Sequence, residues 1–281
     1  MTRLFRSLLF VPGTRPDRFG KAEAAGADAV VFDLEDGVPP ARKADARRAV
    51  GDWFGTAAPT HVARVARING ASTAFFDEDI DWLRRLRGCD AIMLPKVDDS
   101  WMIEQAAQAI ASRTVIPLLE TARGVLNALG IAGAKATMPA VAFGGEDLTA
   151  EIGAERTVDG DELLFARSQV VLAAAALHAD PIDGVLTTIG DDARLRDDAR
   201  RARALGYRGK LAIHPAQVPI INEVFSPTPE AVSHAQRIVD AYADAVARGD
   251  GVLRLENQMV DMPVVVRARK IVELAQRIAK G

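Results

Sequence analysis

The chain has 281 residues, of which 49% are hydrophobic and 26% charged, and its formal net charge at pH 7 is -3. This composition is that of an ordinary globular chain long enough for a substantial core, and the near-neutral balance argues against nucleic acid as a partner. Cys89 is the single cysteine, which excludes an internal disulfide framework and a cysteine-rich metal site and agrees with a reducing compartment.

The first apolar stretch, residues 7–11, follows two arginines and ends at Pro12-Gly13. It is too short for the apolar region of a secretory signal peptide. No later segment approaches the roughly 18 apolar residues that a membrane span needs. We therefore expect a cytoplasmic protein that makes no membrane contact.

Short β-rich apolar runs then alternate with longer helical patterns. Eight strands are predicted, at 7–11, 29–34, 61–68, 91–95, 114–119, 140–143, 183–187 and 210–213. Helices are predicted at 17–25, 42–54, 77–86, 101–112, 125–136, 161–178 and 191–205. This alternation predicts an α/β fold with parallel strands, and eight units are the number that closes a TIM (β/α)8 barrel. An open doubly wound sheet is the structural alternative, although no Gly-x-Gly-x-x-Gly turn supports a dinucleotide site.

The residues after the eighth strand form an extension. It comprises 218–225, a Pro-rich turn at 226–229, a helix at 230–248, the segment 253–262 and an amphipathic last helix at 264–280. Thr228 is a predicted N-cap, with Pro229 at the first helical position. We therefore expect a barrel domain over 1–225 and a C-terminal helical extension over 226–281.

Two neighbouring predicted strands stop on carboxylates. Residues 114–119 are followed by Glu120, and 140–143 by Gly144-Gly145-Glu146-Asp147. The carboxyl ends of barrel strands meet at one mouth, where a hard divalent cation such as Mg2+ would find oxygen ligands and keep open positions. A helix N-terminal carboxylate, stabilised by the helix dipole, is the alternative for each acid.

The other predicted strands also end on polar groups. These ends are Asp33-Leu34-Glu35-Asp36, Arg67-Ile68-Asn69, Pro95-Lys96, Thr187-Thr188 and His214-Pro215. Each alone is consistent with an exposed loop. Together they predict a charged ring around the mouth of the barrel.

Several of these ends are parts of a longer motif series. In chain order it reads LFVPGTRP at 9–16, FDLED at 32–36, LPKV at 94–97, LET at 119–121, FGGEDL at 143–148, IHP at 213–215 and MVDMP at 259–263. The series resembles that of citrate lyase beta subunit-like proteins of the HpcH/HpaI aldolase superfamily, nearly from end to end. The resemblance implies a Mg2+-dependent TIM barrel that makes or breaks carbon–carbon bonds between a 2-keto acid and the enolate of an acyl thioester.

Roles at the mouth follow from this resemblance. It makes Glu120 and Asp147 the ligands of Mg2+, with Mn2+ as the alternative ion, and it makes Arg67 the group that faces the thioester carbonyl. Arg64 is the fallback for Arg67, because strand alternation puts the two on opposite faces. Glu35 and Asp36 would orient metal-bound water rather than bind the ion directly.

The resemblance also implies that Asp261, in the extension, acts as an acid or base at the thioester α-carbon. In this reading the residue is presented across a subunit interface of a homotrimer or hexamer. The alternative is an ordinary N-cap ahead of Pro263. Nearby, Glu256-Asn257-Gln258 stands where relatives more often carry Asp-Gly-Lys, which leaves the choice of substrate open.

Five further residues match substrate positions of the family. Arg15 and Lys21 correspond to groups that meet the phosphates of CoA, and a solvated surface is the alternative for both. His214 is expected to line the pocket near the pantetheine arm. Gly145 and Glu146 complete the predicted substrate-binding set.

The expected reaction is a reversible Claisen-type cleavage of malyl-CoA, citramalyl-CoA or citryl-CoA to acetyl-CoA and a 2-keto acid. Three rival functions remain open. They are a citrate lyase subunit acting on an acyl-carrier-protein thioester, a class II pyruvate aldolase that uses no CoA, and a non-catalytic barrel.

Overall fold

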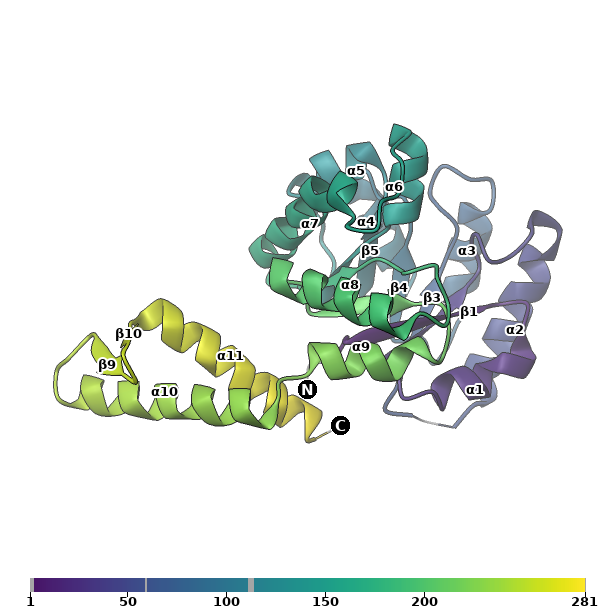
Figure 1. Ribbon diagram of the computed structural model, residues 1–281. Helices are drawn as coiled ribbons and strands as arrows, with labels where there is room; N and C mark the ends of the chain where they lie inside the picture. Colours follow the sequence, from purple (N-terminus) through teal and green to yellow (C-terminus); the bar gives the residue numbers. More distant parts are fainter. Residues whose placement is uncertain (1–2, 59, 111–113, 281) are drawn as a thin grey trace. The chain divides into compact units, whose positions relative to one another are not determined.

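The computed structural model describes residues 3–58, 60–110 and 114–280. Within them, eight parallel strands form a closed barrel in sequence order, and the last strand pairs with the first (Figure 1). The strands are β1 (Ser7–Pro12), β2 (Ala29–Asp33), β3 (Ala63–Arg67), β4 (Ala91–Leu94), β5 (Val115–Leu119), β6 (Ala140–Phe143), β7 (Asp180–Asp183) and β8 (Gly209–Ala212). The prediction of a TIM barrel is confirmed, and the open-sheet alternative is wrong.

Helices follow the strands and surround the barrel. They are α1 (Phe19–Glu23), α2 (Lys43–Thr56), α3 (Phe76–Leu83), α4 (Ser100–Gln108), α5 (Ala122–Leu126), α6 (Gly145–Ile152), α7 (Leu164–Ala176), α8 (Asp192–Leu205) and α9 (Gln217–Phe225). The predicted helix over 101–112 stops at Gln108, and its last two residues lie outside the described residues. The predicted helix over 125–136 is instead α5 and a 3-10 turn at Gly130–Gly133.

Alternate residues of each strand face the inside of the barrel. Apolar side chains fill that interior, among them Val31 and Val65. The opposite face packs beneath the helices, where the ring of Phe32 meets those of Phe19 and Phe54 edge to face. The alternation places the last residues of β2 and β3, both charged, on the inward face.

The seventh strand lies at Asp180–Asp183, earlier than the predicted 183–187. The strand contains a proline and two aspartates, so it lacks the run of apolar residues from which strands were predicted. Pro181 has no backbone N–H to donate, but its carbonyl still accepts from the backbone N–H of Arg208 at 2.8 Å. Asp183 is buried because cationic partners surround it. The apolar run after it belongs to the loop that follows the strand.

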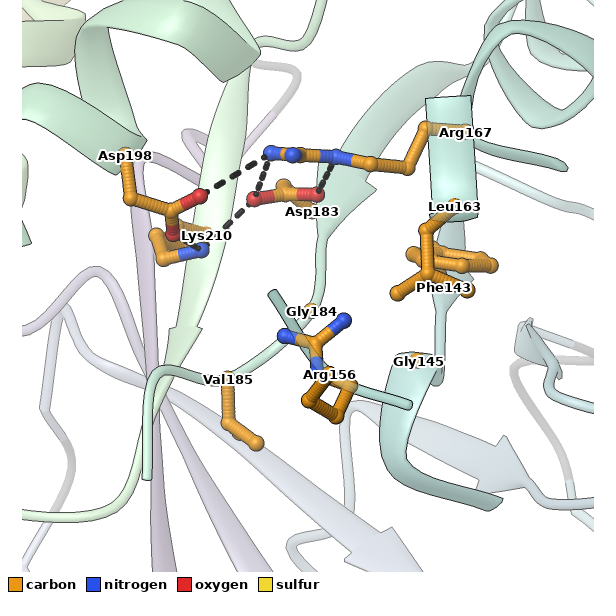
Figure 2. A pocket seen from close by; sticks show the side chains of 10 residues that line it. All are labelled: Phe143, Gly145, Arg156, Leu163, Arg167, Asp183, Gly184, Val185, Asp198 and Lys210. Atoms are coloured by element: carbon orange, nitrogen blue, oxygen red, sulfur yellow. Dashed lines mark hydrogen bonds and ion pairs between the residues drawn. The ribbon is translucent and has the colours of Figure 1, made fainter. Parts of the chain in front are cut away.

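Those partners form a buried ionic cluster that ties β7 and β8 to the helices outside them (Figure 2). Arg167 of α7 donates to both carboxylate oxygens of Asp183, at 3.0 and 2.8 Å. The ammonium of Lys210 lies 2.6 Å from Asp183 and 2.6 Å from Asp198 of α8. Because buried ions lose their hydration, each member depends on the others for compensation.

The chain divides into two compact units, Met1–Phe225 and Ser226–Gly281. The second unit contains α10 (Pro229–Ala247), the hairpin β9 (Leu253–Leu255) and β10 (Gln258–Val260), and α11 (Met262–Ile278). Its own core contains Ile238, Tyr242, Val260 and Val265. The predicted cap is present, since the Thr228 hydroxyl accepts from the N–H of Ala231 at 3.2 Å. Within the described ranges, no helix of either unit is long and apolar enough to cross a bilayer.

The unusual Glu256-Asn257 pair forms the turn of this hairpin. Both residues have positive φ, 46° and 64°. Two-residue hairpin turns of type I′ need this conformation, which asparagine tolerates better than glutamate does. The departure from Asp-Gly is therefore accommodated in the turn, where Arg254 donates to the Asn257 side chain.

The ionic cluster gives a stability prediction. Replacing Asp183 by Asn removes the carboxylate that compensates both Arg167 and Lys210, and should lower the free energy of unfolding by about 3–5 kcal/mol. Urea denaturation followed by circular dichroism measures this. Asp197→Asn, at an exposed position of α8, is the control and should change it by less than about 0.5 kcal/mol. A loss below about 1 kcal/mol for Asp183→Asn would contradict the assigned role of the cluster.

Candidate functional site

Arg67 is the best-fixed side chain at the mouth of the barrel. It is the last residue of β3, and its Nε and Nη2 donate to the two carboxylate oxygens of Asp33, at 2.7 and 2.8 Å. Its Nη1 lies 2.9 Å from Glu35, and the guanidinium lies 4.7 Å from the ring centroid of Phe10. Burial disfavours the charged form, but the charges of Asp33 and Glu35 outweigh it and raise the pKa of Arg67.

Arg64 is excluded as the fallback at the mouth. It faces outward from the same strand, where its Nε donates to Glu23 of α1 at 2.6 Å and its Nη2 to the carbonyl of Ala58. The alternation of β3 therefore assigns the inward position to Arg67.

Asp33 organises this side of the mouth, a role that the sequence did not reveal. Besides holding Arg67, its carboxylate accepts from the N–H groups of Glu35 at 2.8 Å and Gly37 at 2.9 Å. Only glycine fits at position 37, since an added Cβ would lie 2.5 Å from the Asp33 carboxylate. Asp33 thus fixes Arg67 and the loop after β2 together.

Lys96 links the acids of several strands. Its ammonium lies 2.5 Å from Glu35, 3.6 Å from Asp36 and 3.5 Å from Asp147, and its backbone N–H donates to Glu120 at 2.9 Å. Its φ of 51° is costly for a side chain of this type. The sequence analysis placed Lys96 among the charged residues at the mouth but assigned it no role. Its position in the Leu-Pro-Lys-Val motif was the one sign that it belongs to the site.

Glu120 follows β5 and is 2% exposed. Burial, and then the charges of Glu35 and Asp147, raise its pKa to about 8, although Lys96 and Arg67 act in the opposite direction. Gly144 lies against it so closely that an added Cβ would be 2.5 Å from the Glu120 Cβ. The glycine of the Gly-Gly-Glu-Asp motif thus makes room for this carboxylate.

The donor set fits a hard divalent cation. Five carboxylates converge on the mouth with two cationic side chains; they belong to Asp33, Glu35, Asp36, Glu120 and Asp147. Glu35 Oε2 is buried without a hydrogen bond despite its proximity to Arg67. In the part of the chain that the structure describes, no three acidic, histidine or cysteine side chains are arranged as a complete ligand set. Two carboxylates completed by water and substrate are typical of Mg2+.

Three of the predicted substrate-binding residues, Arg15, Glu146 and His214, make local contacts near the strand ends. Arg15 is partly exposed and pairs with Asp17 at 2.8 Å. Glu146, in the first turn of α6, lies 3.4 Å from Arg156. His214 is exposed after β8, and its Nδ1 accepts from Ala216.

Two others differ in their surroundings. Lys21 is exposed on the short helix α1. Gly145 opens α6, lies against Leu163 and lines the pocket of Figure 2.

Asp261 belongs to the second unit and caps α11. Its carboxylate accepts from the N–H of Val264 at 3.3 Å, with Pro263 in the first turn. Met259 and Met262 beside it are 66% and 46% exposed. The capping role is therefore present, while a catalytic role for Asp261 stays a prediction.

The close approach of Gly144 and Glu120 gives a binding prediction. Gly144→Ala should displace the Glu120 carboxylate and weaken Mn2+ binding by about 10-fold or more, because ligand orientation sets metal affinity. Electron paramagnetic resonance of free Mn2+ measures the dissociation constant. Gly133→Ala, where an added Cβ meets nothing within 4 Å, is the control. Equal affinities for both variants and the wild type would refute the assignment of Glu120.

Comparison with known proteins agrees with this geometry. Residues 6–215 match the model of the HpcH/HpaI aldolase/citrate lyase family. A citrate lyase subunit beta-like protein of Deinococcus radiodurans is 41% identical over 95% of this chain and 96% of its own length. A (3S)-malyl-CoA thioesterase of Cereibacter sphaeroides is 34% identical, covering 98% and 96%.

A solved structure extends the likeness to three dimensions. The protein CitE from Mycobacterium tuberculosis, in complex with magnesium, acetoacetate and coenzyme A, superposes with a TM-score of 0.83 at 35% identity. The match covers 98% of this chain and 100% of that one. With its closed barrel, its acidic mouth and these relatives, the chain belongs to the HpcH/HpaI aldolase/citrate lyase family, among its citrate lyase beta subunit-like members.

Proposed function

We propose that this protein is a Mg2+-dependent lyase that cleaves a carboxylated 3-hydroxyacyl-CoA into acetyl-CoA and a 2-keto acid. The observation that carries the proposal is Arg67, held by Asp33 and Glu35 beside a cluster of carboxylates. This places a fixed positive charge next to a site suited to a divalent cation. The likeness to a structure in complex with magnesium, acetoacetate and coenzyme A supports the same classes of ligand.

Glu120 and Asp147 would hold the ion, either Mg2+ or Mn2+. When bound, the ion acts as a Lewis acid on the oxygens of the keto-acid portion of the substrate. Glu35 and Asp36 would accept hydrogen bonds from water in the site, and Lys96 limits the repulsion between these acids.

Arg67 would stabilise the charge that develops during cleavage. As the substrate hydroxyl gives its proton to water in the site and its carbon becomes the carbonyl of the 2-keto acid, the bond to the α-carbon breaks and its electron pair forms the thioester enolate. Asp33 occupies the single N–H of Nε and one N–H of Nη2, and Glu35 lies 2.9 Å from Nη1, so N–H groups of Nη1 and Nη2 remain as donors. A preorganised donor at a developing oxyanion is worth about 100-fold to 1,000-fold in rate.

Asp261 would then give a proton to the α-carbon, which completes acetyl-CoA. We place it across a subunit interface of a homotrimer or hexamer, with residues 226–281 of one subunit serving the barrel of the next. The exposed methionines on either side of Asp261 support an apolar contact there. Arg15, Lys21, Gly145, Glu146 and His214 are proposed to contact CoA or the acyl group.

Hydrolysis of the thioester is the second candidate, since the similar Cereibacter protein is a (3S)-malyl-CoA thioesterase. It would release free CoA and a hydroxy acid instead of acetyl-CoA and a keto acid. The products therefore separate the two reactions. An acyl-carrier-protein substrate and a CoA-free aldolase reaction are the remaining alternatives.

The test offers malyl-CoA, citramalyl-CoA and citryl-CoA with Mg2+ and identifies the products by mass spectrometry. We expect acetyl-CoA and a 2-keto acid from one of them, loss of turnover in EDTA, and recovery with Mn2+. Arg67→Lys, which keeps the charge but loses the two-point contact with Asp33, should lower kcat by about 100-fold. Absence of turnover by the metal-loaded protein with all three thioesters would contradict the proposal.

Subunit complementation tests the assignment of Asp261. Arg67→Ala and Asp261→Asn should each be nearly inactive alone. Co-expressed in random mixed oligomers, they should recover about one quarter of wild-type activity, because that share of sites combines an intact barrel with an intact neighbouring extension. No recovery from mixed oligomers verified by native mass spectrometry would place Asp261 in its own subunit's site or outside catalysis.

A further inference from the structure

The loop after β2 is held in place from two opposite sides. On the barrel side, Asp33 accepts the N–H groups of Glu35 and Gly37. On the helix side, Lys43 of α2 donates to the carbonyls of Leu34 and Glu35, each at 2.7 Å. The Asp33 carboxylate therefore accepts from two N–H groups of this loop, and the Lys43 ammonium donates to two of its carbonyls.

Burial of the charged Lys43 side chain at this position costs free energy of folding. It is 7% exposed, and the ring of Phe75 lies 5.5 Å from its ammonium. Burial lowers its pKa, while the charges of Asp33 and Glu35, followed by those of Asp79 and Asp36, act in the opposite direction. An apolar side chain of the same length would fill this space without the cost of burying a charge.

The contacts of Lys43 explain where Glu35 points. With its carbonyl held toward α2, Glu35 directs its side chain to Arg67 at 2.9 Å and to Lys96 at 2.5 Å. The carbonyl of Glu35 also accepts from the N–H of Val38, which closes the loop. By holding the carbonyls of Leu34 and Glu35 on the helix side, Lys43 therefore also fixes the Glu35 carboxylate on the barrel side.

The next turn of α2 braces the neighbouring strand in a similar way. Arg47, four residues after Lys43 and on the same helix face, donates to the fully buried Asp79 at 2.5 Å. Asp79 in turn accepts from the backbone and the side chain of Asn69, just after β3, at 2.7 Å each. One face of α2 thus supports the ends of both strands that carry Asp33 and Arg67.

We propose that Lys43 is a positioning residue of the site, which sets the carboxylate of Glu35 against Arg67 and Lys96 and, through the same loop, that of Asp36 against Lys96. This inference rests on the proposed function in one respect, that these acids serve the metal and the substrate. Lys43 acts through the loop backbone, so its effect is on orientation rather than on contact with the reacting atoms.

The test compares Lys43→Met, which keeps the length and removes the ammonium, with Arg48→Met on the exposed face of the same helix. Relative to wild type, Lys43→Met should bind Mn2+ about 10-fold more weakly and lower kcat about 10-fold with KM nearly unchanged, as loss of an outer orienting group does. Arg48→Met should change neither. If Lys43→Met does not fold, Lys43→Gln replaces it; this shorter, uncharged side chain should also weaken Mn2+ binding and lower kcat, and values equal to those of Arg48→Met would overturn the inference.

A folded Lys43→Met protein with the Mn2+ affinity and kcat of Arg48→Met would overturn the inference, even if its melting temperature fell. The two proposals fail separately. If the wild type turned over no thioester while Lys43→Met still lost Mn2+ affinity, the proposed reaction would be wrong and the positioning role would stand. A wild-type protein that bound no Mn2+ would overturn both.

Discussion

The two-point ion pair between Arg67 and Asp33 is the contact on which the rest of the site depends. Both residues are the last of their strands, and both face the inside of the barrel, where hydrogen bonds across the β2–β3 ladder fix their separation. A planar guanidinium and a planar carboxylate joined by two bonds have little freedom to rotate. Every other polar group at this side of the mouth is then placed relative to a rigid pair.

The excess of negative charge at the mouth is the second constraint. Arg67 and Lys96 face five carboxylates, and burial, followed by the charges of Glu35 and Asp147, raises the pKa of Glu120. A site built this way is costly for the fold, because like charges at short range and buried ions both oppose folding. The buried cluster at β7 and β8, by contrast, is balanced, because Arg167 and Lys210 both pair with Asp183 and Asp198.

The sequence predicted the parts of this account that leave a local signature. Apolar runs ending on acids located Glu120 and Asp147, and alternation along β3 separated Arg67 from Arg64. The seventh strand was misplaced because Pro181 and Asp183 break the apolar pattern, and their compensation comes from residues distant in sequence. Asp33 and Lys43 carried no signal as organisers, since their contacts depend on which strands and helices become neighbours.

In the helical extension, too, the features with a local sequence signature were predicted and the others were not. The cap at Thr228 and the last helix are local features, and both are present. The hairpin at Glu256-Asn257 was not foreseen, because neither residue is the glycine that usually marks such a turn. Capping by Asp261 needs only local chain geometry, whereas its proposed catalytic role needs a neighbouring subunit, which one chain's sequence does not encode directly.

The most direct measurement of the central claim is a crystal structure of the protein grown with Mn2+ and a 2-keto acid, with the ion located by its anomalous scattering. The account predicts one strong peak at the barrel mouth, in contact with the carboxylates of Glu120 and Asp147, with the keto acid's oxygens completing its coordination. A peak elsewhere, or a mouth in which Glu120 and Asp147 contact no ion at saturating Mn2+, would contradict it.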